Sequence, residues 1–178
     1  MKSTIINKNT NIKNLVIIKP ESFYDYRGEN LQTYDDTEYS QLLENVKFTT
    51  DSYSFSTKNV LRGFHGDVQS SKLIQCLRGT VFFSVIDLRP ESETYHNVFT
   101  CTLNDKNRWQ ILVPSGCVNA HLCISDDCIF SYKLSHGYVP IKNQLHVYWN
   151  DARFLHKINW PTSHVPIVSA RDNPFQHS

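Results

Sequence analysis

Short apolar runs separated by turn residues recur along the chain, and this pattern predicts a fold made mostly of β-strands. Alternation of apolar and polar side chains is clearest in Thr80–Leu88, and the adjacent Phe82 and Phe83 in this run indicate a strand with apolar contacts on both faces. The turns recur at intervals typical of a sandwich or barrel. The predicted strands are Leu15–Ile18, Leu73–Cys76, Thr80–Leu88, Val98–Leu103, Trp109–Val113, Cys128–Lys133 and Leu145–Trp149.

One segment, Thr37–Asn45, predicts a helix, with Asp36 or Thr37 as its amino-terminal cap and with Leu42 and Leu43 facing the core. The first dozen residues are expected to be loose or to form an edge strand. No repeat or linker divides the chain, so residues 1–178 are expected to form a single domain. Turns are predicted at residues 77–79, 89–92, 104–107 and 113–116.

The composition of the chain limits which partners it is expected to bind and in which compartment it is expected to lie. The 178 residues carry 18 Lys+Arg against 17 Asp+Glu, and this balance provides no field that would attract nucleic acid or a membrane surface. The apolar runs are far shorter than the roughly 20 residues of a membrane span, and the start has no signal-peptide pattern, so we expect a cytoplasmic protein. Five cysteines without a CxxC pair indicate reduced thiols, neither a disulfide framework nor a zinc site.

Several polar residues interrupt otherwise apolar strands, which predicts that they line a pocket at the mouth of a barrel. Arg62 and His65 lie in the segment VLRGFHGD, and Lys72 precedes the apolar pair LI. Each of these residues also has a structural interpretation that involves no ligand. An isolated histidine is more often a hydrogen-bonded core residue, and a lysine at a strand start is often solvated. The other interrupting residues are Asn119, His121 and Tyr132.

Six ordered motifs resemble the family of dTDP-4-dehydrorhamnose 3,5-epimerase, whose members act on 4-keto nucleotide sugars. The resemblance runs from about Phe23 to Asp172 and implies a mostly β fold of the cupin type, a double-stranded β-helix or jelly roll with one or two short helices. It also implies a homodimer with exchanged amino-terminal strands, and a reaction without metal or redox cofactor. The motifs are LRGFHGD at 61–67, KL at 72–73, DLR with SxTY at 87–95, WND at 149–151, WP at 160–161 and SARD at 169–172.

The chemistry of that family requires two proton carriers on opposite faces of a sugar. A ketone at C4 acidifies the C–H bonds at C3 and C5, and reprotonation of the enolate from the other face inverts the carbon. By resemblance His65 is the base, Asp172 orients its ring, and Tyr132 is the acid. Lys72 is expected near the C4 oxygen, where it would stabilise the enolate.

The resemblance also suggests residues that hold the substrate. Arg62 is expected to contact the diphosphate with its planar guanidinium, and Arg27 to contact the nucleotide. Tyr138 matches a second family tyrosine that stacks on sugar or base, and Ser54 lies on the approach to the nucleotide. The alternative for each arginine is a surface ion pair, and the alternative for each tyrosine is packing in the β core.

Several positions depart from the rhamnose enzymes and guide the prediction of the substrate. Those enzymes have a histidine at the position of Asn119 and an aromatic residue at the position of His121. In this chain, His121 is expected to hydrogen-bond the sugar or the enolate. The order NAH resembles the branch that acts on GDP-linked 4-keto-6-deoxy-heptoses for capsular polysaccharide. Thr50 and Ser52 also differ from that type, and they argue for GDP over dTDP.

Three other functions stay open on the sequence. The first is a rhamnose-type 3,5-epimerase of a dTDP-linked 4-keto-6-deoxy-hexose. The second is a sugar-nucleotide-binding protein without catalysis, although binding alone does not need two proton carriers. The third is a metal-dependent cupin, which the absence of a His-x-His motif disfavours.

Overall fold

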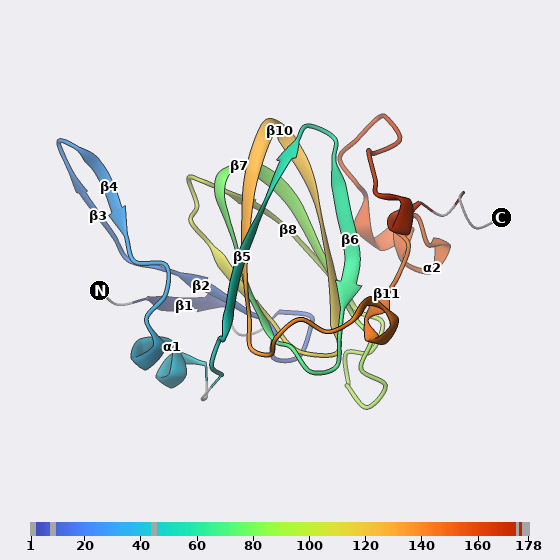
Figure 1. Cartoon of the computed structure of the whole chain (residues 1–178), viewed down its shortest axis with the longest axis horizontal. Helices are drawn as coiled ribbons and strands as arrows, with labels where there is room; N and C mark the ends of the chain where they lie inside the picture. Colours follow the sequence, from blue (N-terminus) through green and yellow to red (C-terminus); the bar gives the residue numbers. More distant parts are fainter. Residues whose placement is uncertain (1–2, 8–9, 44–45, 174, 176–178) are drawn as a thin grey trace.

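Two long antiparallel strands, β7 (Lys72–Asp87) and β10 (Cys117–Leu134), are hydrogen-bonded to each other and link the two sheets of the fold. The structure is a computed structural model that describes residues 3–7, 10–43, 46–173 and 175. Each long strand changes partners along its length: β7 pairs first with β9 and then with β8, and β10 first with β6 and then with β5. One strand pair thereby belongs to both layers of a sandwich (Figure 1).

The first layer continues from β7 through β9, β2 and β1 on one side and from β10 to β5 on the other. The second layer contains β8, the remaining halves of β7 and β10, β6 and β11. This antiparallel topology confirms the predicted jelly roll. The shorter strands are β1 (Thr4–Asn7), β2 (Val16–Lys19), β5 (Thr50–Thr57), β6 (Leu61–Gly66), β8 (Val98–Asn104), β9 (Gln110–Val113) and β11 (Leu145–His146).

Two short helices cover separate apolar clusters. Helix α1 (Asp36–Leu42) buries Tyr39 against a cluster that includes Ile18 of β2. Helix α2 (Ala152–Ile158) buries Phe154 on a cluster beside β6 and β10. Among the described residues, neither helix has the length or the apolar character that a membrane-crossing helix requires. Single turns of 3₁₀ helix, η1 (Ile141–Asn143) and η2 (Ala170–Asp172), complete the elements of the carboxyl-terminal part.

The predicted strands of the core are present, but other elements differ. The strand predicted at Leu145–Trp149 covers only Leu145–His146, and β5 and β6 were not predicted as strands. The turn predicted at residues 77–79 is wrong, because β7 continues through it with Gly79 at a φ of 78° opposite an irregularity of β10. The first helix is capped one residue earlier than expected, by Asp35, and its predicted end at Asn45 lies outside the described residues. Helix α2 was not predicted, although Asp151 caps it. The early residues include the expected edge strand, β1.

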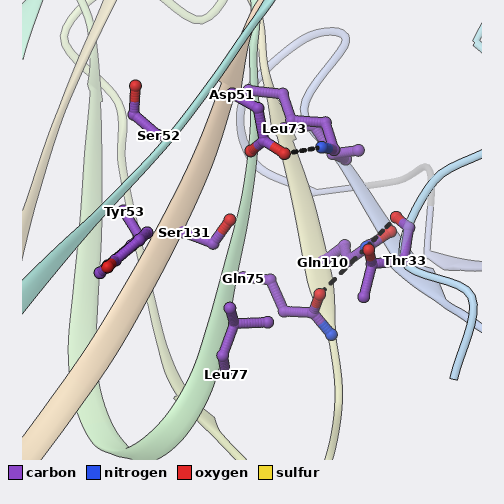
Figure 2. Close-up of a pocket in the computed structure, with 10 residues that line it drawn as sticks. Thr33, Asp51, Ser52, Tyr53, Leu73, Gln75, Leu77, Gln110 and Ser131 are labelled. Atoms are coloured by element: carbon purple, nitrogen blue, oxygen red, sulfur yellow. Dashed lines mark hydrogen bonds and ion pairs between the residues drawn. The ribbon is translucent and has the colours of Figure 1, made fainter. Parts of the chain in front are cut away.

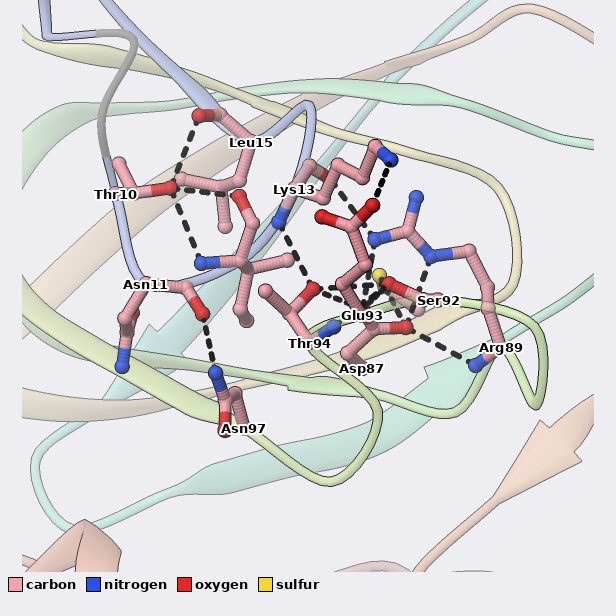
Figure 3. Close-up of polar contacts among 12 residues, drawn as sticks. Thr10, Asn11, Lys13, Leu15, Asp87, Arg89, Ser92, Glu93, Thr94 and Asn97 are labelled. Atoms are coloured by element: carbon pink, nitrogen blue, oxygen red, sulfur yellow. Dashed lines mark hydrogen bonds and ion pairs between the residues drawn. The ribbon is translucent and has the colours of Figure 1, made fainter.

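The motif DLR with SxTY forms a buried polar cluster that fixes the end of β7 (Figure 3). The Asp87 side chain is fully buried and accepts hydrogen bonds from Arg89, Ser92 and Thr94. Burial alone would raise the pKa of Asp87, but these hydrogen bonds hold it well below its usual range. Arg89 also donates to the backbone carbonyl of Lys13, so the cluster joins the amino-terminal segment to the loop after β7.

Candidate active site

A cavity of about 600 Å³ opens between β5, β6, β7, β10 and the carboxyl-terminal segment. It gathers residues that lie more than 100 positions apart in the sequence. Of the ten predicted site residues, nine line this one cavity, and Arg27 does not. The nine are Ser54, Arg62, His65, Lys72, Asn119, His121, Tyr132, Tyr138 and Asp172.

A shift of register in β10 lets both of its ends contribute to the cavity. Asn119 and His121 are two residues apart and therefore project from the same face of the strand. Tyr132 has the opposite parity but lines the same cavity, because the pairing of β10 with β7 is interrupted between Cys123 and Cys128. The irregularity therefore turns the phenol toward the imidazoles of the other half.

A bulge in β6 has the same effect on Arg62 and His65, which are three residues apart. They pair with His121 and Asn119, which are only two apart on β10, so β6 holds one extra residue in this stretch. Gly63 has a φ of 116°, and a Cβ there would collide with the backbone of Asn119. Gly63 of the LRGFHGD motif therefore permits the bulge that brings Arg62 and His65 to the same cavity.

The closest polar contact of the site joins His65 to Asp172. His65 Nε2 lies 2.6 Å from Asp172 Oδ1, and the Asp172 side chain is almost completely buried. The backbone N–H of Gly63 donates to Asp172 Oδ2 at 3.4 Å. Burial would raise the pKa of Asp172, but these hydrogen bonds and the charge of His65 lower it. A charged carboxylate fixes the proton of His65 on Nε2 and leaves Nδ1 as the nitrogen able to accept one.

Lys72 lines the same cavity and is held by two hydrogen bonds. Its ammonium donates to the backbone carbonyl of His65 at 2.9 Å and to Asn119 Oδ1 at 2.8 Å. Burial lowers the pKa of Lys72 to about 8, with the charge of Asp67 opposing it. Lys72 is therefore mostly a cation at neutral pH, on the cavity wall where the resemblance predicts an oxyanion.

Two buried polar atoms of the cavity lack hydrogen-bond partners within the described part of the chain. They are Nε2 of His121 and Oγ of Ser54. The His121 ring stacks on Phe130 with centroids 3.8 Å apart, and burial lowers its pKa to about 3. His121 is therefore neutral. A buried polar group without a partner costs about 1–3 kcal/mol, so both atoms suit a polar ligand.

The remaining predicted residues line the cavity more loosely. Arg62 is tied to β5, because its guanidinium donates to Ser56 Oγ at 3.0 Å and to the carbonyl of Phe55 at 3.2 Å. Tyr132 is half-buried on β10, whereas Tyr138 is 71% exposed in the segment after that strand. The roles assigned to these side chains stay predictions.

Arg27 is the predicted binding residue that does not line this cavity. It lies at the turn of a separate hairpin formed by β3 (Ser22–Asp25) and β4 (Gly28–Leu31), which extends away from the sandwich (Figure 1). Its guanidinium pairs with Asp25 at 2.6 Å. Within the described part of the chain, the hairpin forms a two-stranded sheet of its own, and its Glu29 pairs with Arg108, so Arg27 lies away from the cavity of its own chain.

His146 is a residue of the site that the sequence analysis did not identify. It belongs to β11, is the direct register partner of His65, and stacks with it at a centroid distance of 5.5 Å. Its Nε2 lies 3.4 Å from Asp172 Oδ1. Burial and the charge of His65 lower the pKa of His146, although Asp172 opposes the shift. No local motif marks this histidine, because its neighbours come from other strands.

A second cavity of about 290 Å³ lies beside β5, β7, β9 and the end of β10 (Figure 2). Its charged groups and one of its amides are already paired: Lys133 contacts Asp51 at 2.6 Å, and Gln110 donates to the carbonyl of Thr33 at 2.7 Å. Its lining contains no histidine. The larger cavity is therefore the better candidate for acid–base chemistry.

The cysteines offer no competing nucleophile. Cys76, Cys101, Cys117, Cys123 and Cys128 are all free, and each is buried except Cys101, which is partly buried. Burial raises the pKa of Cys101 and Cys117 to about 12, so neither thiol ionises near neutral pH. The burial agrees with the expected mostly buried thiols.

Comparisons with known proteins decide the family. Residues 9–177 match the family model of dTDP-4-dehydrorhamnose 3,5-epimerase. The enzyme of that name from Salmonella typhimurium is 34% identical over 167 residues, which cover 92% of this chain and 90% of the relative. The chain belongs to this family. It is therefore an isomerase, as the motifs predict.

Two further members of the family are informative about ligand and reaction. The structure of dTDP-6-deoxy-D-glucose-3,5-epimerase from Legionella pneumophila in complex with dTDP-4-keto-L-rhamnose superposes with a TM-score of 0.87 at 30% identity, covering 96% of this chain and 89% of that one. A dTDP-4-dehydrorhamnose 3-epimerase from Streptomyces niveus is 31% identical over 87% of this chain and 75% of its own. These relatives carry dTDP in their names, whereas Asn119 and His121 predicted a GDP-linked substrate.

Proposed function

We propose that this member of the family epimerises C3, or C3 and C5, of a dTDP-linked 4-keto-6-deoxy-hexose without a metal or redox cofactor. The observation that carries the proposal is that His65 and Tyr132 line one cavity together with Asp172 and Lys72. A cavity of about 600 Å³ falls within the usual size range of small-molecule sites. An imidazole and a phenol within one cavity are the pair of proton carriers that inversion requires.

In the proposed first step, His65 removes the proton on the carbon next to the C4 ketone. The accepting atom is Nδ1, since Nε2 is hydrogen-bonded to Asp172 at 2.6 Å. The electron pair of the broken C–H bond forms a C=C bond, and the carbonyl becomes an enolate. The buried carboxylate of Asp172 stabilises the imidazolium that results.

The enolate oxygen is stabilised by the ammonium of Lys72. That ammonium is held by Asn119 and by the His65 carbonyl, so its position is fixed before the substrate arrives. A preorganised charged donor lowers the energy of the enolate without reorganisation during the reaction. In the second step, the phenol of Tyr132 gives its proton to the opposite face of the carbon, and the C4 carbonyl re-forms. Proton exchange with solvent then restores neutral His65 and the Tyr132 phenol.

His121 and Ser54 are proposed to bind the sugar nucleotide. Their buried Nε2 and Oγ atoms, which lack protein partners among the described residues, match a ligand rich in hydroxyl groups. Arg62 is proposed to bind the diphosphate, and Tyr138 to stack on sugar or base. The roles come from the family resemblance and from the shared cavity.

The dTDP-linked substrate is preferred because the named relatives act on dTDP sugars and match nearly the whole chain. A GDP-linked 4-keto-6-deoxy-heptose is the second candidate. Asn119 and His121 favour it, because they replace the residue types of the rhamnose enzymes. Comparing kcat/KM for the two substrates decides between them: a ratio above one for GDP would reverse the preference.

The test of the reaction is incubation with dTDP-4-keto-6-deoxy-glucose in D2O, followed by NMR of the sugar. We expect deuterium at C3, and at C5 if both centres invert. His65→Asn should abolish exchange at every carbon, while the control His156→Asn, an exposed residue of α2, should exchange like the wild type. Full exchange in His65→Asn would disprove the assigned base, and no exchange with wild-type protein on either substrate would disprove the epimerase.

Tyr132→Phe separates proton removal from inversion. It keeps the ring but loses the acid, so we expect C3 exchange to persist while inversion falls by about 10²-fold or more. Tyr95→Phe, outside the cavity lining, is the matched control and should invert the sugar at the wild-type rate. Unchanged inversion by Tyr132→Phe would assign the acid to another group.

We also propose that two copies form a homodimer through the β3–β4 hairpin. Phe23, Tyr24 and Tyr26 on this hairpin are 50%, 72% and 97% exposed, a larger aromatic exposure than an isolated surface favours. Pairing with a second copy would bury them and bring Arg27 toward the other chain. Light scattering should give twice the mass of the 20.7 kDa chain, and a monomer at micromolar concentration would contradict the dimer.

A further inference from the structure

Two histidines, one of which is the proposed base His65, converge on one carboxylate. His65 Nε2 and His146 Nε2 lie 2.6 Å and 3.4 Å from the same oxygen, Asp172 Oδ1. The ligand atoms of the three residues all lie within 4.8 Å of one another. Three separate elements, β6, β11 and η2, supply these side chains.

The strand register explains why both imidazoles face the carboxylate. His146 is the Cα partner of His65 in the antiparallel β6–β11 pair, and directly opposed residues project from the same face. Their rings are nearly parallel, with an interplanar angle of 29°. Nε2 of His146 is buried and makes no hydrogen bond with any described residue, although Asp172 is close. That nitrogen is therefore available as a ligand.

The donor set matches the chemistry of first-row divalent metals. Two imidazole nitrogens and one carboxylate oxygen on one side of an ion form a facial triad, and they leave its other positions open. Metal bonds to these atoms are about 2.0–2.2 Å long, so two neighbouring ligands of one ion lie about 3.0–3.5 Å apart. The separations of 2.6 Å and 3.4 Å from Asp172 Oδ1 to the two imidazole nitrogens are near this range, and side-chain rotation must close the remaining separation between the two nitrogens, which is at most 4.8 Å.

The site is also reachable. The side chains of His65 and His146 are 29% and 23% exposed, and His65 and Asp172 line the main cavity. An ion can therefore enter from the cavity that admits the sugar nucleotide. By contrast, the remaining histidine of the cavity, His121, stacks on Phe130 and belongs to the part of the wall nearer Arg62.

We propose that His65, His146 and Asp172 form a binding site for a divalent transition-metal ion, and that the bound ion inhibits the enzyme. The ion replaces the His65–Asp172 hydrogen bond and takes the Nε2 lone pair. The ring proton then moves to Nδ1, the nitrogen that must accept the proton of the substrate. Metal binding stands on the geometry alone, whereas inhibition rests on the proposed function.

The experiment measures binding and activity separately, on full-length protein without a histidine tag. Isothermal titration with Zn²⁺ should give one site per chain, and Co²⁺ should give a visible absorption spectrum without a thiolate band. His146→Ala should weaken binding at least tenfold, while the control His156→Ala should bind as the wild type does. His146→Gln repeats the test with a larger polar side chain, and circular dichroism verifies the fold of each variant.

The activity arm compares the epimerisation rate with and without Zn²⁺ for each protein. Inhibition of the wild type and of His156→Ala at the concentration that fills the site, and its loss in His146→Ala, would support the proposal. Three results would overturn it. The first is a titration without a one-to-one site, the second is a zinc affinity of both His146 variants equal to that of the wild type, and the third is full activity of the zinc-loaded wild type. If no protein epimerises but the binding results hold, the proposed function fails and the metal site stands.

Discussion

Lys72 Nζ lies 2.8 Å from Asn119 Oδ1, and this hydrogen bond links β7 to β10 at the wall of the cavity. The amide oxygen accepts from the ammonium without neutralising it, unlike a carboxylate. The cation therefore keeps its charge at the cavity wall, where the proposed mechanism places the developing oxyanion. The pairing gives Asn119 a positioning role that its place in the sequence motif does not reveal.

Replacing Lys72 by Met keeps the length of the side chain and removes the charge. We expect kcat to fall by about 10²–10³-fold, because the enolate loses its charged donor, while KM changes little. Asn119→Ala should have a smaller effect on kcat, since the ammonium keeps the His65 carbonyl as a partner. Steady-state kinetics distinguish the two, and a larger loss for Asn119→Ala than for Lys72→Met would contradict this assignment.

His121→Phe should separate stability from function. The change preserves stacking on Phe130 and removes a buried Nε2 without a partner among the described residues, so the free energy of unfolding should rise by about 1 kcal/mol. The same change removes a proposed hydrogen bond to the sugar, so KM should increase about tenfold. Urea unfolding and substrate titration measure the two effects. A loss of stability with unchanged KM would show that His121 is structural.

The Asp87 cluster should make stability depend on pH. Its pKa is depressed in the folded protein, so its contribution to stability is complete above its unfolded pKa of about 4 and is lost as pH falls toward the folded value. We expect Asp87→Asn to lower the free energy of unfolding by about 3 kcal/mol at pH 7. The gap to the wild type should narrow below pH 4 in chemical unfolding. An equal gap at both pH values would disprove the linkage.

Gly66→Ala tests the close approach of β6 and β10. A Cβ at this position would collide with the backbone carbonyl of Cys117, so the strands must separate, and we expect a loss of roughly 1–3 kcal/mol in the free energy of unfolding. Gly137→Ala is the matched control, because a Cβ there meets nothing within 4 Å. Thermal unfolding of both variants measures the effect, and equal midpoints would contradict the steric argument.

Local sequence patterns were sufficient to predict an element where the burial of its side chains determines its backbone conformation. The alternation in Thr80–Leu88 predicted the second half of β7, and Asp36 and Thr37 marked the first helix to within a residue of its cap. The turn predicted at residues 77–79 was wrong because Gly79 lies at an irregularity inside a continuous strand. A glycine with positive φ fits a turn or a bulge equally well, and only the partner strand decides between them.

The order of residues along the chain determined the family, the jelly roll and nine of the residues that line the cavity, because strand periodicity and a motif such as LRGFHGD are local properties of a sequence. Tertiary structure alone decided the rest. It separated Arg27 from the cavity and brought His146 beside His65. The physical reason is that strand register and the path of the carboxyl-terminal segment depend on pairing between distant residues, which no local pattern encodes.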